Sequence, residues 1–256
     1  MKKHLKKMAF LLLLTFLSMT VLPSVNAFAG TGSIVTINGE QILVKQTSKE
    51  NIVTQIKDGK VYEFVYLKQK DIVTATIKEL NTDKVIEKKV IDIGQTKEKA
   101  KSMETIQNPI DKSALSSEIT PYSTIRSVTT KSGYSYDIDS NGISYYKDGN
   151  INLPYTSIGV YTNSTPSSLR SAYESDVSAI RSLESKISTA YGFQTLSVII
   201  EAIIVVMAGP FGGALSAYLL SLGFASGAIY FASDLEAAMA KADGDFHSLY
   251  AYRITG

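Results

Sequence analysis

Apolar and polar side chains alternate in short runs between residues 33 and 93, which is the pattern of antiparallel strands with one solvated face. The runs are rich in Val, Ile and Thr. Turn sequences such as Asn38-Gly39 and Asp58-Gly59 separate them. The pattern predicts six strands: Ser33–Ile37, Gln41–Gln46, Asn51–Ile56, Lys60–Leu67, Asp71–Glu79 and Lys84–Ile93.

A second group of strand-like runs follows residue 123 and is rich in tyrosine. Asn141-Gly142 and Asp148-Gly149 mark turns between the runs. The predicted strands are Thr124–Thr130, Gly133–Asp139, Ile143–Lys147 and Ser157–Tyr161. The weak alternation of Asp245–Gly256 suggests one more strand that returns to this sheet.

The periodicity changes at Thr165-Pro166, where Thr is a favoured helix N-cap and Pro a favoured first helical residue. Apolar residues then recur every three or four positions as far as Tyr191, opposite a face of balanced charges. We therefore predict an amphipathic helix of about two dozen residues, with its apolar stripe packed on a core.

The most apolar part of the chain follows this helix. Gln194–Ala208 and Ala214–Ala232 are two apolar segments, separated by the helix-breaking sequence Gly209-Pro210-Phe211-Gly212-Gly213. Together they predict a helical hairpin, whose second helix carries a GxxxG pair and a face of small residues. A helix that is apolar all round must be enclosed by protein or by lipid.

Two interpretations of the hairpin remain open, insertion into a membrane and burial as a soluble core. The single charged residue, Glu201, would be costly in lipid if it were ionised, unless it faced a partner or a water-filled lumen. The residues expected to insert are Leu196, Ile199, Ile200, Glu201, Ile203, Ile204, Gly209, Pro210, Gly223 and Gly227.

The first residues form a secretory signal peptide by their pattern. A basic stretch precedes the apolar run Met8–Leu22, and Ala27-Phe28-Ala29 offers small residues at both cleavage subsites. We expect residues 1–29 to be removed and the protein to be secreted and extracellular. The run is shorter than the ~20 residues that a membrane span needs.

Removal of the leader changes the charge balance. The chain has 26 Lys+Arg and 24 Asp+Glu, and four of the lysines lie in the leader. The remainder therefore carries 22 basic against 24 acidic residues, a net charge of −2, with no basic stripe for nucleic acid. With no cysteine and with His247 as its one histidine, it also lacks the residues for thiol, His-triad or paired-histidine metal chemistry. We expect a protein that is not an enzyme.

The composition also divides the chain near residue 120. Every arginine of the chain lies beyond that point: Arg126, Arg170, Arg181 and Arg253. We predict a β-rich domain over 30–94 that could serve as a pro-domain, a linker over 95–120, and a C-terminal domain over 121–256. The polar linker is either a simple connection or the site of a maturation cut. The whole chain is of the α+β class.

One motif has the spacing of a calcium loop. Asp137, Asp139 and Asn141 alternate before Gly142, and Asp148 stands where an EF-hand has its closing Glu. An EF-hand needs a helix on each side, whereas the flanking tyrosines are typical of strands. A β-hairpin that turns at Ser140-Asn141-Gly142 is the alternative, so calcium is a candidate cofactor and no other is expected.

This order of parts resembles that of large secreted bacteriocins, in particular the geobacillin-type group of large, unmodified bacteriocins. Residues 120–256 carry the likeness, chiefly Gln194–Ala232, which is also similar to the hydrophobic hairpin of pore-forming colicins. The resemblance implies an antibacterial toxin that acts at the target-cell membrane. Its partners would be bacterial membrane lipid and a receptor of the cell envelope.

Two other functions compete with this one. An exported binding or structural module of the cell envelope would use the same apolar hairpin as its core. A hydrolase that uses Asp137 and Asp139 as a carboxylate pair is poorly supported, because no base, oxyanion-hole motif or phosphate loop accompanies them.

Overall fold

The computed structural model describes residues 32–98, 124–149 and 157–254. The predicted leader with its cleavage point after Ala29, and residues 99–120 of the predicted linker, lie outside the described residues. The class is α+β, as predicted from the sequence.

The first sheet has six antiparallel strands in sequence order, each paired with the next. Their bounds are β1 Ser33–Ile37, β2 Glu40–Gln46, β3 Glu50–Lys57, β4 Lys60–Leu67, β5 Ile72–Glu79 and β6 Val85–Asp92, within a residue or so of the prediction. Asn38-Gly39 and Asp58-Gly59 form the β1–β2 and β3–β4 turns with positive φ at all four residues. Two-residue turns of this kind match the twist of paired strands. A helical turn over residues 93–98 follows β6.

The second sheet has four antiparallel strands in the order β10-β9-β8-β7. The strands are β7 Thr124–Thr129, β8 Ser135–Asp139, β9 Ile143–Lys147 and β10 Ser157–Tyr161. The prediction is confirmed for all four, and Tyr134, Tyr136 and Tyr146 are fully buried beneath the helices.

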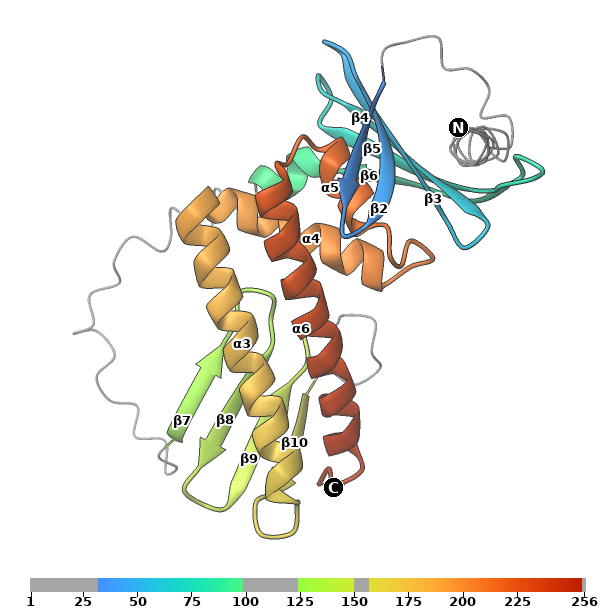
Figure 1. Ribbon diagram of the computed structural model, residues 1–256. Helices are drawn as coiled ribbons and strands as arrows, with labels where there is room; N and C mark the ends of the chain where they lie inside the picture. The colour runs from blue at the N-terminus through green and yellow to red at the C-terminus, as the bar shows by residue number, and fades with distance from the viewer. Residues whose placement is uncertain (1–31, 99–123, 150–156, 255–256) are drawn as a thin grey trace, which may run out of the picture.

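Two helices of 25 residues, α3 (Ser167–Tyr191) and α6 (Ser226–Tyr250), run antiparallel side by side across the second sheet (Figure 1). Helix α3 is the predicted amphipathic helix, but its cap differs from the expectation. Pro166 occupies the N-cap position and no side chain caps the helix. Thr165 is buried, and its hydroxyl makes no hydrogen bond with a described residue.

The apolar hairpin departs from the prediction in its second half. Helix α4 (Phe193–Met207) is the predicted first helix, but the predicted second helix over 214–232 is two pieces. Helix α5 (Leu215–Ser221) ends after seven residues, and α6 begins at Ser226. Gly223 has a φ of +87°, and the N–H groups of Gly223 and Phe224 bond the carbonyls of Leu220 and Leu219. This is a Schellman helix ending, which the apolar composition concealed.

The predicted strand over Asp245–Gly256 is also wrong for most of its length, because α6 continues to Tyr250. Beyond the helix, Arg253 forms one antiparallel bridge with Val160, and the Ile254 N–H bonds the Gly159 carbonyl at 2.8 Å. The chain thus returns to β10 as expected, but by a single bridge. The helical pattern of Leu235, Met239, Ala242 and Phe246, all buried, prevails over the weak alternation.

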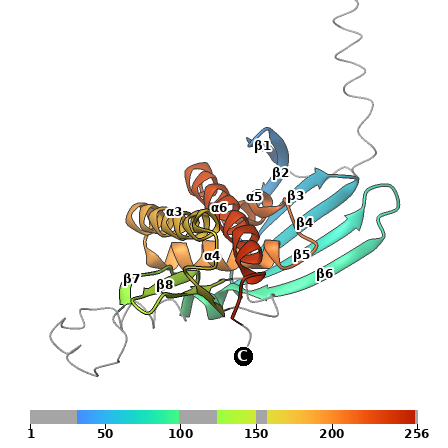
Figure 2. The same ribbon diagram turned by 90° about the horizontal axis from the view of Figure 1, so that it is seen from below.

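The two sheets and the helices share one hydrophobic core, which runs from Ile37 in β1 to Leu249 in α6. Helix α5 packs against β2, β3 and β4, while α4 contacts each of the other three helices. Figure 2 shows the strands β1–β6 curving past α5. The apolar segment is therefore where the N-terminal sheet meets the rest of the chain.

The Schellman ending makes Gly223→Ala destabilising. Alanine in the left-handed region costs about 1–2 kcal/mol, although the position is exposed and a Cβ would meet only Asn51 Nδ2, at 4.0 Å. Gly244→Ala is the matched control, because Gly244 lies inside α6 with open space around it and alanine favours a helix by up to about 1 kcal/mol. Urea unfolding should show opposite signs. A neutral or stabilising Gly223→Ala would contradict the ending described above.

Candidate functional site: an apolar segment covered by the N-terminal sheet

One face of the first sheet is apolar and faces the helices. Strand pairing places Val53 opposite Phe64 and Phe64 opposite Ala75, and all three are buried. The same face carries further buried apolar residues: Ile42, Val44, Tyr62, Val73, Ile77 and Ile91. We call this surface the inner face of the sheet. Alternation along each strand explains it, because every second residue points to the same side.

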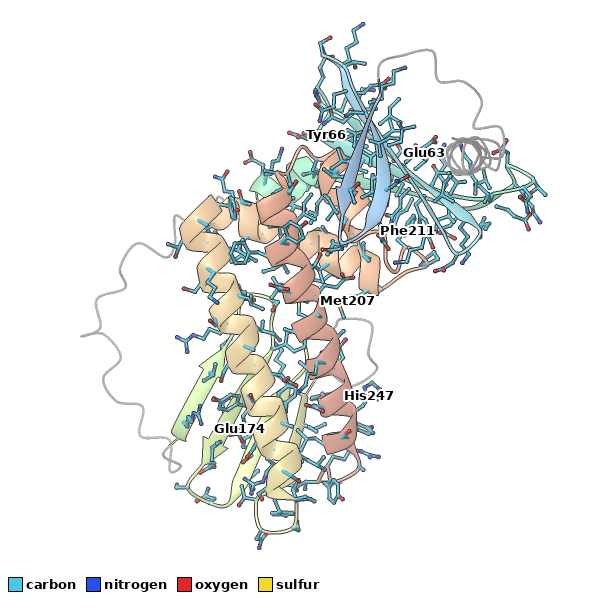
Figure 3. All side chains as sticks on the ribbon, in the orientation of Figure 1. Glu63, Tyr66, Glu174, Met207, Phe211 and His247 are labelled. Atoms are coloured by element: carbon cyan, nitrogen blue, oxygen red, sulfur yellow. The ribbon has the colours of Figure 1, made fainter. Side chains whose placement is uncertain are left out.

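Helix α5 and the turn before it fill the inner face. All seven residues of α5 are buried. The Phe64 ring stacks on Tyr218 with ring centroids 5.4 Å apart, and it meets Phe211 at 6.2 Å with a tilt of 48°. Such aromatic pairs contribute about 1 kcal/mol each beyond the burial of their area. Figure 3 shows Phe211 in the α4–α5 turn beside the sheet.

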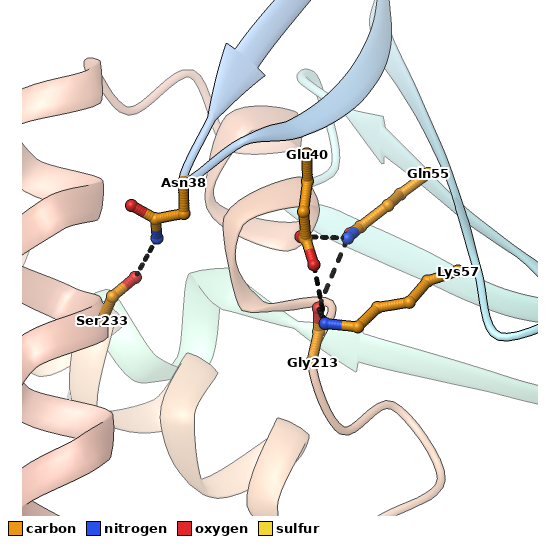
Figure 4. Close-up of polar contacts among 6 residues, drawn as sticks. All are labelled: Asn38, Glu40, Gln55, Lys57, Gly213 and Ser233. Atoms are coloured by element: carbon orange, nitrogen blue, oxygen red, sulfur yellow. Dashed lines mark hydrogen bonds and ion pairs between the residues drawn. The ribbon is translucent and has the colours of Figure 1, made fainter.

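Polar side chains of β3 hold both ends of α5. At one end, the buried Asn51 amide donates to the Ser221 carbonyl at 2.8 Å. At the other end, Gln55 Nε2 lies 3.4 Å and Lys57 Nζ 3.5 Å from the Gly213 carbonyl (Figure 4). The carbonyl at the end of a helix has no partner within the helix, so Asn51 satisfies a group that burial would otherwise leave unpaired.

Glu40 completes the cluster at Gly213. Its carboxylate accepts from Lys57 Nζ at 2.7 Å and from Gln55 Nε2 at 2.5 Å (Figure 4). The hydrogen bond from Glu40 raises the pKa of Lys57, against the opposing effect of partial burial. A further contact joins the β1–β2 turn to α6, where Asn38 Nδ2 lies 3.4 Å from Ser233 Oγ. We refer to Asn38, Glu40, Asn51, Gln55 and Lys57 together as the latch.

Two ionisable groups behind this contact have raised pKa values. Burial raises the pKa of the Tyr218 hydroxyl well above its ordinary range, and the charge of Glu201 adds to the effect. Burial also raises the pKa of Glu236 on α6, while the charge of Lys57 acts in the opposite direction. Both shifts follow from ionisation in a poorly solvated environment.

The residues predicted to insert into membranes are mostly covered in this structure. Leu196, Ile199, Ile200 and Ile203 are buried, and Glu201 and Ile204 are half-buried on α4. In the described part of the chain, no helix combines the length and the apolar character needed to cross a bilayer.

The four predicted glycine and proline positions lie outside helix interiors or at a helix start. Gly209 and Pro210 are exposed in the α4–α5 turn. Gly223 ends α5 and Gly227 lies in the first turn of α6, so the predicted GxxxG packing face does not form. At Gly227 a Cβ would come within 2.9 Å of the Tyr191 hydroxyl, which makes this glycine a contact between α3 and α6.

The predicted calcium ligands do not converge. Asp137 and Asp139 lie in β8, and Asn141 is in the turn, where its backbone N–H bonds Asp139 Oδ1 at 3.0 Å. Asp148 follows the far end of β9, roughly 20 Å along the chain from that turn at the rise of a strand. No group of three or more acidic or histidine side chains among the described residues could hold a metal ion. The β-hairpin alternative is the one that the structure contains.

The latch was not found from the sequence, although a signal for it exists. Asn51 and Gln55 occupy the same face of β3 as Val53 and are almost fully buried. Amides at core positions of a strand imply that they have hydrogen-bond partners elsewhere, but the sequence does not identify those partners. His247, the one histidine beyond the predicted leader, is exposed on α6 (Figure 3).

No protein-family model matches the sequence, and comparisons with curated proteins and with solved structures found no significant similarity either.

The stacked Tyr218 gives a test of this packing. Its hydroxyl is buried and makes no hydrogen bond with a described residue, so Tyr218→Phe should raise the free energy of unfolding by about 1 kcal/mol. Tyr134→Phe is the matched control, because its hydroxyl donates to Asp243 at 2.6 Å and its loss should cost about 2 kcal/mol. Chemical denaturation checks both values. A loss of stability in Tyr218→Phe would reveal a partner for the hydroxyl.

Glu236 gives a pH test. Because its pKa is raised on folding, the folded protein binds more protons, and this group's contribution to stability falls as pH rises between the unfolded and folded pKa values. Glu236→Gln should therefore stabilise the protein near pH 7, and the gain should vanish below about pH 4. Urea unfolding at both pH values, with the exposed Asp234→Asn as control, measures the difference. A gain independent of pH would refute the assigned cause.

Proposed function

We propose that this chain is a secreted, bacteriocin-like antibacterial protein that acts on target-cell membranes, and that the sheet β1–β6 covers its membrane-active segment. The observation that carries the proposal is the position of α4 and α5. They belong to the most apolar segment of the chain, and α5 is fully buried between the inner face of a sheet from the other end of the sequence and the helices α4 and α6. The resemblance to large bacteriocins in residues 120–256 supports the same function.

Removal of the sheet would uncover Phe211 and Tyr218, whose rings contact Phe64, and the side of α5 that packs on β2, β3 and β4. Burial of apolar area lowers the free energy by roughly 25 cal/mol per Å², so this surface, once exposed, would bind a bilayer or another apolar partner. The latch opposes this release. Asn51 bonds the Ser221 carbonyl at the end of α5, and Gln55 bonds the Gly213 carbonyl before its start. The Glu40–Lys57 ion pair lies beside the contact at Gly213.

Insertion would require the helices to rearrange on the bilayer. Helix α4 has 15 residues, or about 22 Å at 1.5 Å per residue, against a hydrocarbon core of about 30 Å. The break at Gly223 shortens α5 further. Release from the sheet would remove the packing that holds α4 and α5 in their present positions, and Glu201 is already at the edge of the buried surface of α4.

A second candidate function is supported by the break at Gly223 between α5 and α6. An envelope-binding or structural module would keep the apolar helices as its permanent core, and the short α5, the buried latch amides and the lack of a membrane-spanning helix in the described residues all suit that role. The two candidates differ in whether the sheet ever leaves α5.

Cleavage between the two parts decides between them. A site for a specific protease, placed between residues 99 and 120 of the chain that begins at residue 30, should leave the uncut protein inactive. After cutting, it should release dye from vesicles that contain phosphatidylglycerol. The same chain without the site, treated with the same protease, is the control.

Replacing Asn51 by Leu should increase release after cutting, because the sheet then loses its buried bond to Ser221 and dissociates more readily. If the cut protein releases no dye and its two parts stay together in gel filtration, the proposal is rejected in favour of the envelope module.

A further inference from the structure

A groove lies where the β7–β8 turn meets the end of α3 and the start of α4. Its volume is about 360 Å³, within the range of small-molecule sites. Its polar lining comes from Thr129, Lys131, Arg181, Glu184, Ser185, Ser188 and Thr189. The α3 residues recur at helical spacing, so Arg181, Ser185 and Ser188 present one continuous strip to the groove.

The two cations of the groove are available for a ligand. Lys131 and Arg181 are exposed, and neither side chain forms an ion pair with another described residue. Four hydroxyl side chains, one of them that of Thr129 on β7, accompany them within the same lining. An arginine fork, a lysine point charge and hydroxyl donors are the groups that bind phosphate oxygens in proteins.

The one carboxylate in the lining is already engaged. Glu184 is 3% exposed, and its two oxygens accept from the backbone N–H groups of Lys131 and Ser132 at 2.6 and 2.7 Å. It therefore fixes the β7–β8 turn against α3 and holds Lys131 at the rim. Because its oxygens point to these donors, the solvent-facing polar groups of the groove are cationic or hydroxylic.

The apolar side of the groove belongs to α4. Lys131 Nζ lies over the Phe193 ring, 5.4 Å from its centroid, and Leu196 forms part of the lining. Phe193 is the first residue of α4 and Leu196 is one of the residues predicted to insert. A ligand here would contact cations on one side and the beginning of the apolar segment on the other. An anionic lipid has a matching arrangement, with a negatively charged headgroup next to apolar acyl chains.

The charge of the whole chain does not supply this attraction, because the part from residue 30 onward has a net charge of −2. Binding to an anionic surface would have to come from a local site. We propose that this groove binds the phosphate group of an anionic lipid headgroup, which places the start of α4 at the bilayer. The proposal deepens the proposed function and rests on it for the choice of lipid as the source of the phosphate.

The test is equilibrium binding of the uncut chain from residue 30 to vesicles, measured by cosedimentation, so that it does not depend on insertion. We expect binding to vesicles that contain phosphatidylglycerol and none to pure phosphatidylcholine. Each charge removed near a membrane surface weakens binding about fivefold. The double variant Lys131→Gln/Arg181→Gln should therefore bind about 25-fold more weakly.

The matched control is Lys147→Gln. Lys147 is exposed on β9 and is not part of the groove lining, so its loss changes the net charge but should leave binding within about twofold. Thermal unfolding of the variants checks that they fold. Soluble sn-glycerol 1-phosphate is the second probe, and NMR should show shifts at Ser185, Ser188 and Thr189 that the double variant loses.

Equal vesicle binding by the double variant and by Lys147→Gln would overturn the proposal. Binding of glycerol phosphate without any vesicle binding would overturn its lipid assignment. The proposed function fails separately: groove-dependent vesicle binding with no dye release after cutting would support the groove and reject insertion, whereas dye release unaffected by the double variant would reject the groove alone.

Discussion

The contact between α5 and the inner face of the first sheet is the interaction on which the remaining structure depends. A helix of seven residues is not stable by itself in water, because nucleation outweighs so few hydrogen bonds. The sheet likewise has an apolar face, centred on Phe64, that needs a cover. Each element therefore completes the other, and the Phe64–Tyr218 stack is at the centre of their contact.

Apolar packing alone would not fix where α5 lies on that face. The amides of β3 do so, since Asn51 and Gln55 are four residues apart on one side of the strand and bond carbonyls on either side of the helix. These bonds satisfy the amide nitrogens, whereas Asn51 Oδ1 and Gln55 Oε1 are buried without a partner among the described residues, so the bonds offset only part of the cost of burial. These bonds fix the position of α5 along β3. The half-buried Glu40–Lys57 ion pair adds at most about 1 kcal/mol to the stability of this contact.

The two ends of the apolar segment thus have different surroundings. Near its start, Phe193 lies at a groove with two available cations. Near its middle, Phe211 and α5 are enclosed by the sheet. In the proposed function the first region meets the membrane while the second is still covered. Surface binding and release of the apolar helices would then be separate steps, controlled by different residues.

Local sequence patterns determined most of the elements: the strands, the amphipathic α3, α4 and the break at residues 209–213 all follow from periodicity and turn residues, which act over a few neighbouring positions. Tertiary structure decided the rest. The helix ending at Gly223 depends on tertiary packing, because all seven residues of the short α5 are buried. Helix α6 continues to Tyr250 because Phe246 and Leu249 are buried. The backbone carbonyls to which Asn51 and Gln55 donate are 170 and 158 residues away. Contacts over such distances depend on how complete faces fit together, and no local pattern encodes them.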